Sequence, residues 1–549
     1  MSTEAASTNR VHPWVILGLI SVPVFIGSLD LTIVSAFLPE IVLKLGLPLQ
    51  TALDDAAWVV SGYLLAYAIS MIFMGRVSDL IGRRAVYVVC LLVFVAGSVL
   101  VATAHQWPTD VLNTLLRRSG VRLAREEITL FAIIIGRVVQ ALGAGALVPV
   151  SLALVGDLFP PERRAQPLGM IGAVDTLGWV LGHLYGGILV NFFATHQEGF
   201  SALLSGLGWP PPDWRTLFWI NVPLTLVGLA LTLWALRGVK EQRTKGRFDL
   251  LGTVLIGGAL VALVSGLGGN VDISMAPTNV EDMNRLPPLN GGALLLAAVC
   301  FGLFVLVESR VRDPLIRLGM FRRRNLAAGA IINLFIGFCL MIGLVTVPIL
   351  INVRIEDASQ LSEAALQTGV LLSALTVPMA LAAVPGGWLS ERIGYRKTTA
   401  LGLGLAIIGF GLVWQTWSLE MSDALVAVEM AFIGVGIGLT FSPISAAVIN
   451  AADEDTRGVA SALVIILRLI GMTVAVASLT NFALNRITQL AGAELGVVHG
   501  GTEALQFVNT YALIAVRVLA ELGLLGAVIC GLALIPTWWG LGKRADAAG

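Results

Sequence analysis

Ionisable side chains stand inside the long apolar segments of this 549-residue chain, and five of them could perform chemistry. A charged group near the middle of a bilayer is costly, so each of them is a functional hypothesis by default. A buried carboxyl group can carry a proton, because burial disfavours its charged form. The chemistry that these residues could perform is therefore proton transfer. They are Asp30, Arg137, Asp175, His183 and Arg468.

Each of these residues also has a plain structural explanation. Asp30 has no basic residue at helical spacing, so it is either a proton carrier or a carboxyl group that only hydrogen-bonds across helices. Arg137 could form a buried ion pair that locks two helices. His183 stands among glycines, where it either relays protons beside Asp30 or is a neutral, hydrogen-bonded histidine, since an imidazole titrates at about pH 6.5.

The segments that hold these residues are long enough to cross a membrane. The chain is 56% hydrophobic and 13% charged, with a mean hydropathy of +0.86, whereas soluble domains carry about 25% charged residues. Apolar stretches of about 18 to 26 residues, each sufficient for roughly 30 Å of hydrocarbon, recur along the chain. We therefore predict an all-α integral membrane protein with 14 transmembrane helices. The predicted spans are 13–37, 57–75, 85–104, 128–150, 168–193, 217–237, 249–268, 291–308, 325–351, 368–389, 398–418, 424–448, 458–482 and 513–537.

Positive residues give the orientation. With both termini in the cytoplasm, most Lys and Arg fall in cytoplasmic segments, and the densest clusters are 237–247 and 310–324. We predict a multi-pass protein of the cell (inner or plasma) membrane. The formal net charge is zero, which gives nucleic-acid binding no basis. The four cysteines stand singly in apolar runs, so we predict no metal site and no cofactor.

Two predicted cytoplasmic loops share one pattern. The first is Gly75-Arg-Val-Ser-Asp79-Leu-Ile-Gly82-Arg-Arg84, and the second is Gly387-Trp-Leu-Ser-Glu391-Arg-Ile-Gly394-Tyr-Arg396-Lys397. In each loop the acid can pair with nearby arginines or cap the following helix. The second glycine allows a tight reversal between two spans.

A second internal parallel places Asp175 and Arg468 at matching positions. The same offset relates Arg164 to Arg457. Opposite charges at similar depths in two repeated units suit either a contact that forms in one state and breaks in another, or a permanent structural pair.

These repeats divide the chain into three parts. We predict an N-terminal six-helix half in residues 1–237, a C-terminal six-helix half in 325–549, and helices 7 and 8 inserted between them in 238–324. Internal repeats around a midplane site are the usual architecture of secondary transporters. The sequence has no Gly-x-x-x-x-Gly-Lys-Ser/Thr phosphate loop, so ions rather than ATP would supply a driving force.

These motifs resemble those of the major facilitator superfamily, and within it the 14-span drug:proton antiporter family. The loop 75–84 resembles the superfamily's motif between helices 2 and 3. Residues 29–34, 136–145 and 213–223 are similar to the family's motifs in helix 1, helix 4 and the start of helix 6. Several segments, among them Leu184-Tyr185-Gly186, look closest to the mycobacterial-type lipid exporters of this fold.

The resemblance implies roles for particular residues. It favours Asp30 as a proton carrier, because exporters of this family use acids in helix 1. It assigns Arg137 to proton transfer or to tuning nearby acids, and we add Asp175, Arg468 and His183 as proton-coupling candidates. It makes the two repeated loops the conformational gating loops. Their residues are Gly75, Asp79, Gly82, Arg83, Arg84, Gly387, Glu391, Gly394 and Arg396.

Helix 5 matches the family's antiporter motif with one departure, because His183 stands where the motif has proline. Losing that proline removes a kink and restores a backbone donor. Glycines at intervals of four remove side-chain bulk, so we expect helix 5 to pack closely against helix 10, a contact that the resemblance places between the halves. The glycines of this interface motif are Gly178, Gly182, Gly186 and Gly187.

The resemblance implies a proton-coupled secondary active exporter of amphiphilic or lipophilic compounds that works by alternating access. The alternative is a lipid exporter, for acylglycerols or glycolipids, rather than a multidrug efflux pump. The expected partners are the amphiphilic or lipid substrate, protons, the bilayer and an extracytoplasmic lipid-carrier protein. We predict no enzyme, because neither His-Glu-x-x-His nor paired catalytic acids occur in the spans; a non-transporting receptor with this fold stays an alternative.

The segment 105–127, between predicted helices 3 and 4, is longer than the outer loop that the family has between these helices. The segment mixes leucines and valines with arginines on the side that should be poor in positive charge. It is either an interfacial helix on the outer leaflet or a solvated insertion with no transport role.

Overall fold

The computed structural model describes residues 11–47, 56, 58–196, 198–200, 211–239, 243, 246–267, 289–354, 361–494 and 503–542. In this part of the chain all regular secondary structure is helical. Twelve helical segments there are long and apolar enough to cross a membrane, and α9 (Ala165–Thr195) and α12 (Leu250–Gly266) occupy the two other predicted spans. The prediction of an all-α membrane fold is confirmed, and the observed helices agree with the 14 predicted spans.

The helices follow one another in three sets. The N-terminal group is α1 (Pro13–Ile33), α2 (Leu38–Lys44), α4 (Trp58–Ile81), α5 (Arg83–Ala102), α6 (Trp107–Arg118), α7 (Arg125–Ala144), α8 (Leu147–Leu158), α9 and α11 (Trp214–Ala235). The inserted pair is α12 and α14 (Gly291–Glu308). The C-terminal group is α15 (Arg324–Val353), α16 (Leu361–Ile393), α17 (Tyr395–Thr416), α18 (Asp423–Ala451), α19 (Arg457–Glu494) and α20 (Glu503–Gly540). The domain boundaries at residues 237 and 325 stay a prediction.

Two glycines turn the chain between antiparallel helices. Gly82 separates α4 from α5 with a φ of 99°, and Gly394 separates α16 from α17 with a φ of 90°. A positive φ is readily adopted only by glycine, so a single residue suffices to reverse the chain. The tight reversals predicted for the two repeated loops are confirmed.

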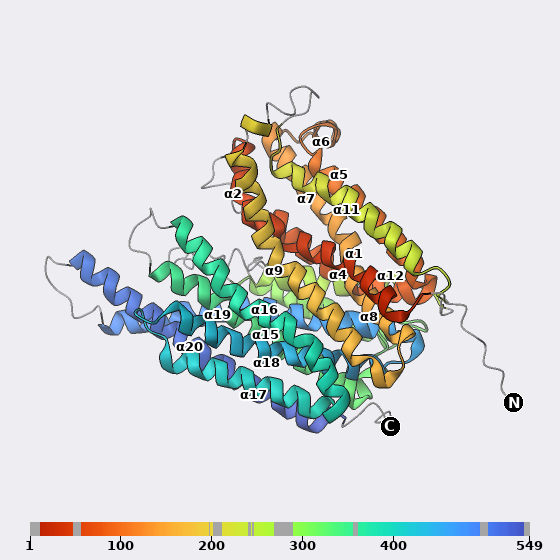
Figure 1. Ribbon diagram of the computed structural model, residues 1–549. Helices are drawn as coiled ribbons and strands as arrows, with labels where there is room; N and C mark the ends of the chain where they lie inside the picture. The colour runs from red at the N-terminus through yellow and green to blue at the C-terminus, as the bar shows by residue number, and fades with distance from the viewer. Residues whose placement is uncertain are drawn as a thin grey trace.

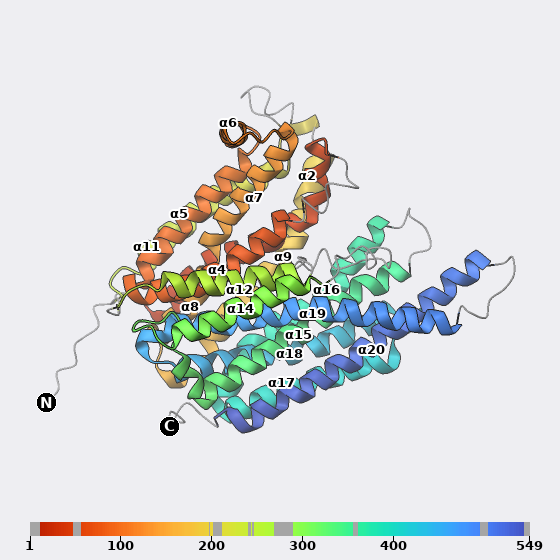
Figure 2. The same cartoon turned by 180° about the vertical axis from the view of Figure 1, so that it is seen from behind.

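The N-terminal and C-terminal groups lie close together at one end and diverge at the other (Figure 1). We call these the closed end and the splayed end. The groups meet where α9 packs against α16 and where α19 packs against α4 and α8. In the inserted pair, α12 and α14 pack against each other and α12 packs against α4 (Figure 2).

The splayed end carries the longest helices. Helices α19 and α20 have 38 residues each, which is roughly 57 Å at 1.5 Å per residue, against roughly 30 Å of hydrocarbon. The predicted insertion 105–127 forms α6 here, and it packs against α7 (Figure 1). Trp107, Val111 and Leu115 repeat at intervals of four on α6 and are 52%, 50% and 52% exposed. The segment is helical, as the interfacial alternative requires, and its contact with a leaflet stays a prediction.

Candidate functional site

A buried ion pair joins α1 to α7 inside the N-terminal group. Arg137 Nη1 lies 2.6 Å from Asp30 Oδ2, and neither side chain has any exposed surface. Arg137 Nη2 also donates to the main-chain oxygen of Asp30 at 3.2 Å. The structure thus brings together two residues that the sequence named separately as proton-coupling candidates.

Three neutral side chains complete this Asp30 site. Gln140 of α7 donates to Asp30 Oδ1 at 3.1 Å, and Asn221 of α11 donates to the same oxygen at 2.5 Å. The ring of Tyr63 on α4 lies 3.8 Å from the guanidinium carbon of Arg137, which is the distance of a cation–π contact. Helices α1, α4, α7 and α11 therefore converge on one carboxylate.

The ion pair neutralises two charges where no water reaches them. Removing one partner of such a pair costs about 3–5 kcal/mol, because the other charge is then left buried and unpaired. Protonation of Asp30 has a similar consequence, since it cancels the charge that Arg137 faces. A proton on Asp30 would therefore weaken the attraction between the two side chains.

Asp175 of α9 and Arg468 of α19 are half-buried and belong to different groups. Ser28 donates to Asp175 Oδ1 at 2.6 Å, and the guanidinium carbon of Arg468 lies 4.3 Å from the ring centre of Phe441. The two opposite charges attract each other, but among the described residues no ion pair of 4.0 Å or less joins them. This state lacks the permanent pair that the sequence allowed, and the state-dependent contact stays a prediction.

An apolar cavity of about 360 Å³ lies between α1, α9 and α11. Two of its lining residues, Ile188 and Leu224, are 58% and 45% exposed, so the cavity opens at the protein surface. Asn221 lines it as well and reaches Asp30 from there. The other lining residues are Phe25, Ile26, Leu29, Leu181 and Tyr185.

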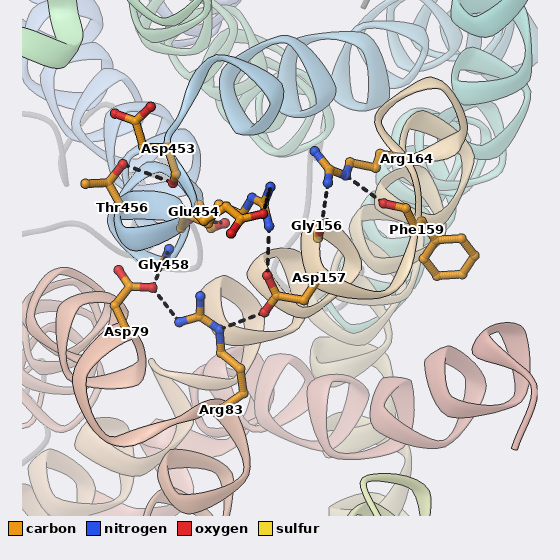
Figure 3. Close-up of polar contacts among 12 residues, drawn as sticks. Asp79, Arg83, Gly156, Asp157, Phe159, Arg164, Asp453, Glu454, Thr456 and Gly458 are labelled. Atoms are coloured by element: carbon orange, nitrogen blue, oxygen red, sulfur yellow. Dashed lines mark hydrogen bonds and ion pairs between the residues drawn. The ribbon is translucent and has the colours of Figure 1, made fainter. Parts of the chain in front are cut away.

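At the closed end, an acid of each gating loop reaches the start of a helix in the opposite group. Asp79 Oδ1 on α4 accepts a hydrogen bond from the main-chain nitrogen of Gly458 on α19 at 3.1 Å (Figure 3). Glu391 Oε1 on α16 accepts from the main-chain nitrogen of Gln166 on α9 at 3.2 Å. A helix N-terminus favours negative charge, so both contacts hold the groups together.

Where α4 meets α19 and where α16 meets α9, the main chains also come into contact. A Cβ on Gly75 would lie 2.6 Å from the main-chain oxygen of Gly458, and a Cβ on Gly387 would lie 2.6 Å from the Cα of Gln166. Any side chain at Gly75 would push α4 away from α19, and any side chain at Gly387 would push α16 away from α9. Both loops thus need their first glycine for close approach.

Arg83 connects the first gating loop to a residue that the sequence did not single out. Its Nη1 lies 2.6 Å from Asp79, and its Nε lies 3.4 Å from Asp157 on α8. Asp157 also accepts from Arg457 of α19 at 3.1 Å, which adds an ion pair between the groups (Figure 3).

Arg164 makes the corresponding contact from the N-terminal group. Its Nη1 donates to Asn450 Oδ1 of α18 at 2.7 Å. The offset that relates Arg164 to Arg457 also relates Asp157 to Asn450. This internal repeat is the sequence signal that could have revealed Asp157 and Asn450 as the partners of the two arginines. Burial lowers the pKa of the Arg164 guanidinium to about 10, so the group stays charged at neutral pH.

The remaining gating residues do not cross between the groups. Arg84 is exposed. Arg396 donates through Nε to the main-chain oxygen of Leu541 at 3.0 Å, just after α20. Arg396 therefore holds α17 against α20 within the C-terminal group.

The glycines of helix 5 face a different helix from the predicted one. A Cβ on Gly178 would lie 2.8 Å from the main-chain oxygen of Phe25 on α1, and a Cβ on Gly182 would meet Leu29 of the same helix. Helix α9 does pack against α16, as expected, but near its start, where a Cβ on Gly169 would meet α16. Placing Gly178 and Gly182 on the α16 face was therefore wrong, because these two glycines hold α9 against α1.

The rest of the helix 5 motif is only partly described. Gly186 is buried in α9. His183 and Gly187 belong to the same helix, but their surroundings lie outside the described residues. The proton-relay role of His183 stays a prediction.

Known proteins share sequence with most of this chain. A profile of the Major Facilitator Superfamily matches residues 20–476. Proteins named triacylglyceride transporter from Mycobacteroides abscessus and Mycobacterium tuberculosis are each 30% identical to this chain, over 87% of it and 84% of the relative. A protein of the same name from Mycolicibacterium hassiacum is 29% identical over 95% of this chain and 91% of its own.

Solved structures share the fold at low sequence identity. The human organic anion transporter MFSD10 superposes with a TM-score of 0.55 at 14% identity, covering 95% of this chain and 100% of its own. The proton:xylose symporter XylE, bound to 6-bromo-6-deoxy-D-glucose, superposes with a TM-score of 0.53 at 15% identity, covering 95% of each chain. At this identity the likeness shows the arrangement of helices alone.

Proposed function

The chain belongs to the major facilitator superfamily and is a transporter rather than an enzyme, and we propose that it exports a neutral lipid of the acylglycerol class across the cell membrane, driven by protons. The sequence favoured a broader amphiphilic substrate and kept a lipid as the alternative. The names of the mycobacterial relatives support that alternative better than a multidrug pump.

The observation that carries the proposal is the contact between the apolar cavity and the Asp30 site. An acyl chain is apolar and needs no hydrogen bonds, so it matches a cavity that is lined by aliphatic and aromatic side chains and one amide. Asn221 both lines the cavity and donates to Asp30 Oδ1 at 2.5 Å. A chain that enters or leaves the cavity can therefore shift Asn221 and change how strongly Asp30 holds a proton.

Asp30 carries the proton in the proposed cycle. In the described state its carboxylate lies 2.6 Å from Arg137, so the two charges balance each other. When a proton arrives, Arg137 loses its counter-charge. Gln140 accepts from Arg137 Nη1 at 2.7 Å and can hold the guanidinium group while Asp30 is neutral.

The closed end is cytoplasmic in this proposal, because the predicted topology puts most positive residues on that side. The described arrangement is then an outward-open state, with the groups apart at the splayed end (Figure 1). Opening the closed end requires the contacts of Asp79 with Gly458 and of Glu391 with Gln166 to break. Asp175 and Arg468 would approach each other as the splayed end closes.

An acylglycerol does not dissolve in water, so a transported molecule needs an acceptor on the outer side. We therefore include an extracytoplasmic lipid-carrier protein as a partner in the proposal.

The test uses the purified protein in vesicles that contain a fluorescent triacylglycerol, with an apolar acceptor outside and an imposed proton gradient. We expect gradient-dependent transfer of the lipid by the wild type and none by Asp30→Asn. The matched control is Glu40→Gln, which changes an acid that lies 2.7 Å from Lys44 on α2, and it should transfer lipid normally.

Two results would contradict separate parts of the proposal. Gradient-driven export of a cationic dye without lipid transfer would show that the substrate is wrong. Lipid transfer at the same rate with and without the gradient would show that protons do not drive it.

A further inference from the structure

Two buried acids meet in the inserted pair, away from the Asp30 site. Asp249 is the N-cap residue of α12, and Glu308 is the last residue of α14. They are 9% and 4% exposed. The two helices pack against each other, so the start of α12 lies beside the end of α14.

Each acid has one carboxyl oxygen with a donor. Asp249 Oδ1 accepts from the main-chain nitrogen of Gly252 at 2.8 Å, and Glu308 Oε2 accepts from that of Ile316 at 3.2 Å. The other two oxygens, Asp249 Oδ2 and Glu308 Oε1, are buried and have no hydrogen-bond partner among the described residues. A buried oxygen without a donor is costly, so both of these need an explanation.

The two unpartnered oxygens point to one place. A Cβ on Gly252 would lie within 2.7 Å of both Asp249 Oδ2 and Glu308 Oε1. Two carboxyl groups that share a buried site cannot both be ionised without strong repulsion. A single proton there would satisfy both oxygens, because one would donate it as O–H and the other would accept it.

The charged groups around the pair favour one shared proton. Arg76 of α4 is 3% exposed and attracts Glu308. It also donates to the main-chain oxygen of Asp455, in the C-terminal group, at 3.4 Å. Asp313 lies near Arg76 and accepts from the main-chain nitrogen of Arg247 at 3.2 Å. With one proton the pair carries one negative charge, and the positive charge of Arg76 attracts it.

We propose that Asp249 and Glu308 share one proton and form a second proton-binding site, which fastens the start of α12 to the end of α14. When the proton leaves, two facing carboxylates repel each other, and the start of α12 and the segment after α14 loosen. The site responds to the proton concentration at the closed end. It depends neither on the substrate nor on the role of Asp30.

Hydrogen exchange of the purified full-length protein tests this site directly. The amides of Gly252 and Ile316 donate to the two acids, so the peptides that contain them report its state. After correction for the chemical exchange rate, we expect the protection of both amides in the wild type to fall about tenfold as the pH rises and the proton is lost. Glu308→Gln should keep high protection at every pH, because its amide group donates to Asp249 Oδ2 as the shared proton would.

Three further variants make the test decisive. Asp249→Asn should also remove the pH-dependent step, since asparagine still caps a helix. Gly252→Ala should lower protection at every pH, because its Cβ would occupy the space between the acids. Asp313→Asn changes a nearby acid outside the pair, so the protection of both amides should fall with pH as it does in the wild type.

Several results would overturn the proposal. One is that the pH-dependent fall in protection, as seen in the wild type, persists in both Glu308→Gln and Asp249→Asn. Another is wild-type protection that stays constant over the whole pH range. Protection that rises with Na⁺ or K⁺ at fixed pH, and does not respond to protons, would mean that a metal cation joins the two oxygens instead.

Discussion

Removing the charge of Asp79 should shift the protein towards the state in which the closed end opens. Asp79 Oδ1 accepts from Gly458 at the start of α19 at 3.1 Å, and this contact exists only while the two groups meet. Asp79→Asn keeps the shape and an acceptor oxygen but removes the negative charge. The ion pair of Asp79 with Arg83 lies within the N-terminal group, so it is common to both states and does not enter the difference.

The size of the shift follows from the helix dipole. The interaction of a negative charge with a helix N-terminus is favourable by about 0.3–1 kcal/mol when the charge is exposed, and by up to about 2 kcal/mol when it is partly buried. Asp79 is 1% exposed, so we expect a loss of about 1–2 kcal/mol. Since about 1.4 kcal/mol corresponds to a factor of ten, the ratio of the two states should change by about five- to thirty-fold.

Distances between spin labels would measure this ratio. Val89→Cys on α5 and Leu401→Cys on α17 place one label in each group, and both positions are 48% exposed. In a background without the native cysteines, Asp79→Asn should enlarge the population with the longer distance.

Glu454→Gln is the matched control for this measurement. It changes a 70% exposed acid that lies 3.6 Å from Arg457, at the same helix start, and it should give the wild-type distribution. If Asp79→Asn gave the wild-type distribution, or if both variants shifted it equally, the contact of Asp79 with Gly458 would not be what holds the closed end together.

Three further predictions concern groups inside the spans. Asp30→Asn should abolish gradient-driven transfer while substrate binding stays measurable; wild-type transfer would remove Asp30 from the mechanism. Asp175→Ala and Arg468→Ala should be non-additive in transport by at least about 0.5 kcal/mol in a double-mutant cycle, whereas additive effects would mean that they act separately. If His183 relays protons, His183→Pro should change the pH profile of transport. An unchanged rate and pH profile would mean that His183 is a neutral histidine with a structural role.

Local patterns predicted the helices well, because the length of an apolar run and the glycine at a reversal are properties of a few neighbouring residues. Hydropathy therefore located the spans, and the loop motif located Gly82 and Gly394. Contacts between helices were harder to predict. Asp30 and Arg137 are far apart in the sequence, and no periodicity shows that the end of α1 lies beside the middle of α7.

The motif glycines of α9 illustrate the same limit. A spacing of four predicts a face without bulky side chains, but it does not say which helix covers that face. Both α1 and α16 flank α9, and Gly178 and Gly182 face α1. Asp157 was missed for a related reason, since a single acid has no pattern until the internal repeat pairs it with Asn450.

Helix α4 is the element that can connect proton binding to the closed end. Among the described residues, the Asp30 site is built from helices of the N-terminal group alone, so movement of the two groups does not break its contacts directly. Coupling therefore needs an element that touches both the site and the C-terminal group. On α4, Tyr63 lies 3.8 Å from the Arg137 guanidinium carbon, and Asp79 contacts Gly458. These residues are roughly 24 Å apart along the helix axis, so a small tilt of α4 when Asp30 is protonated would be felt at the contact between Asp79 and Gly458.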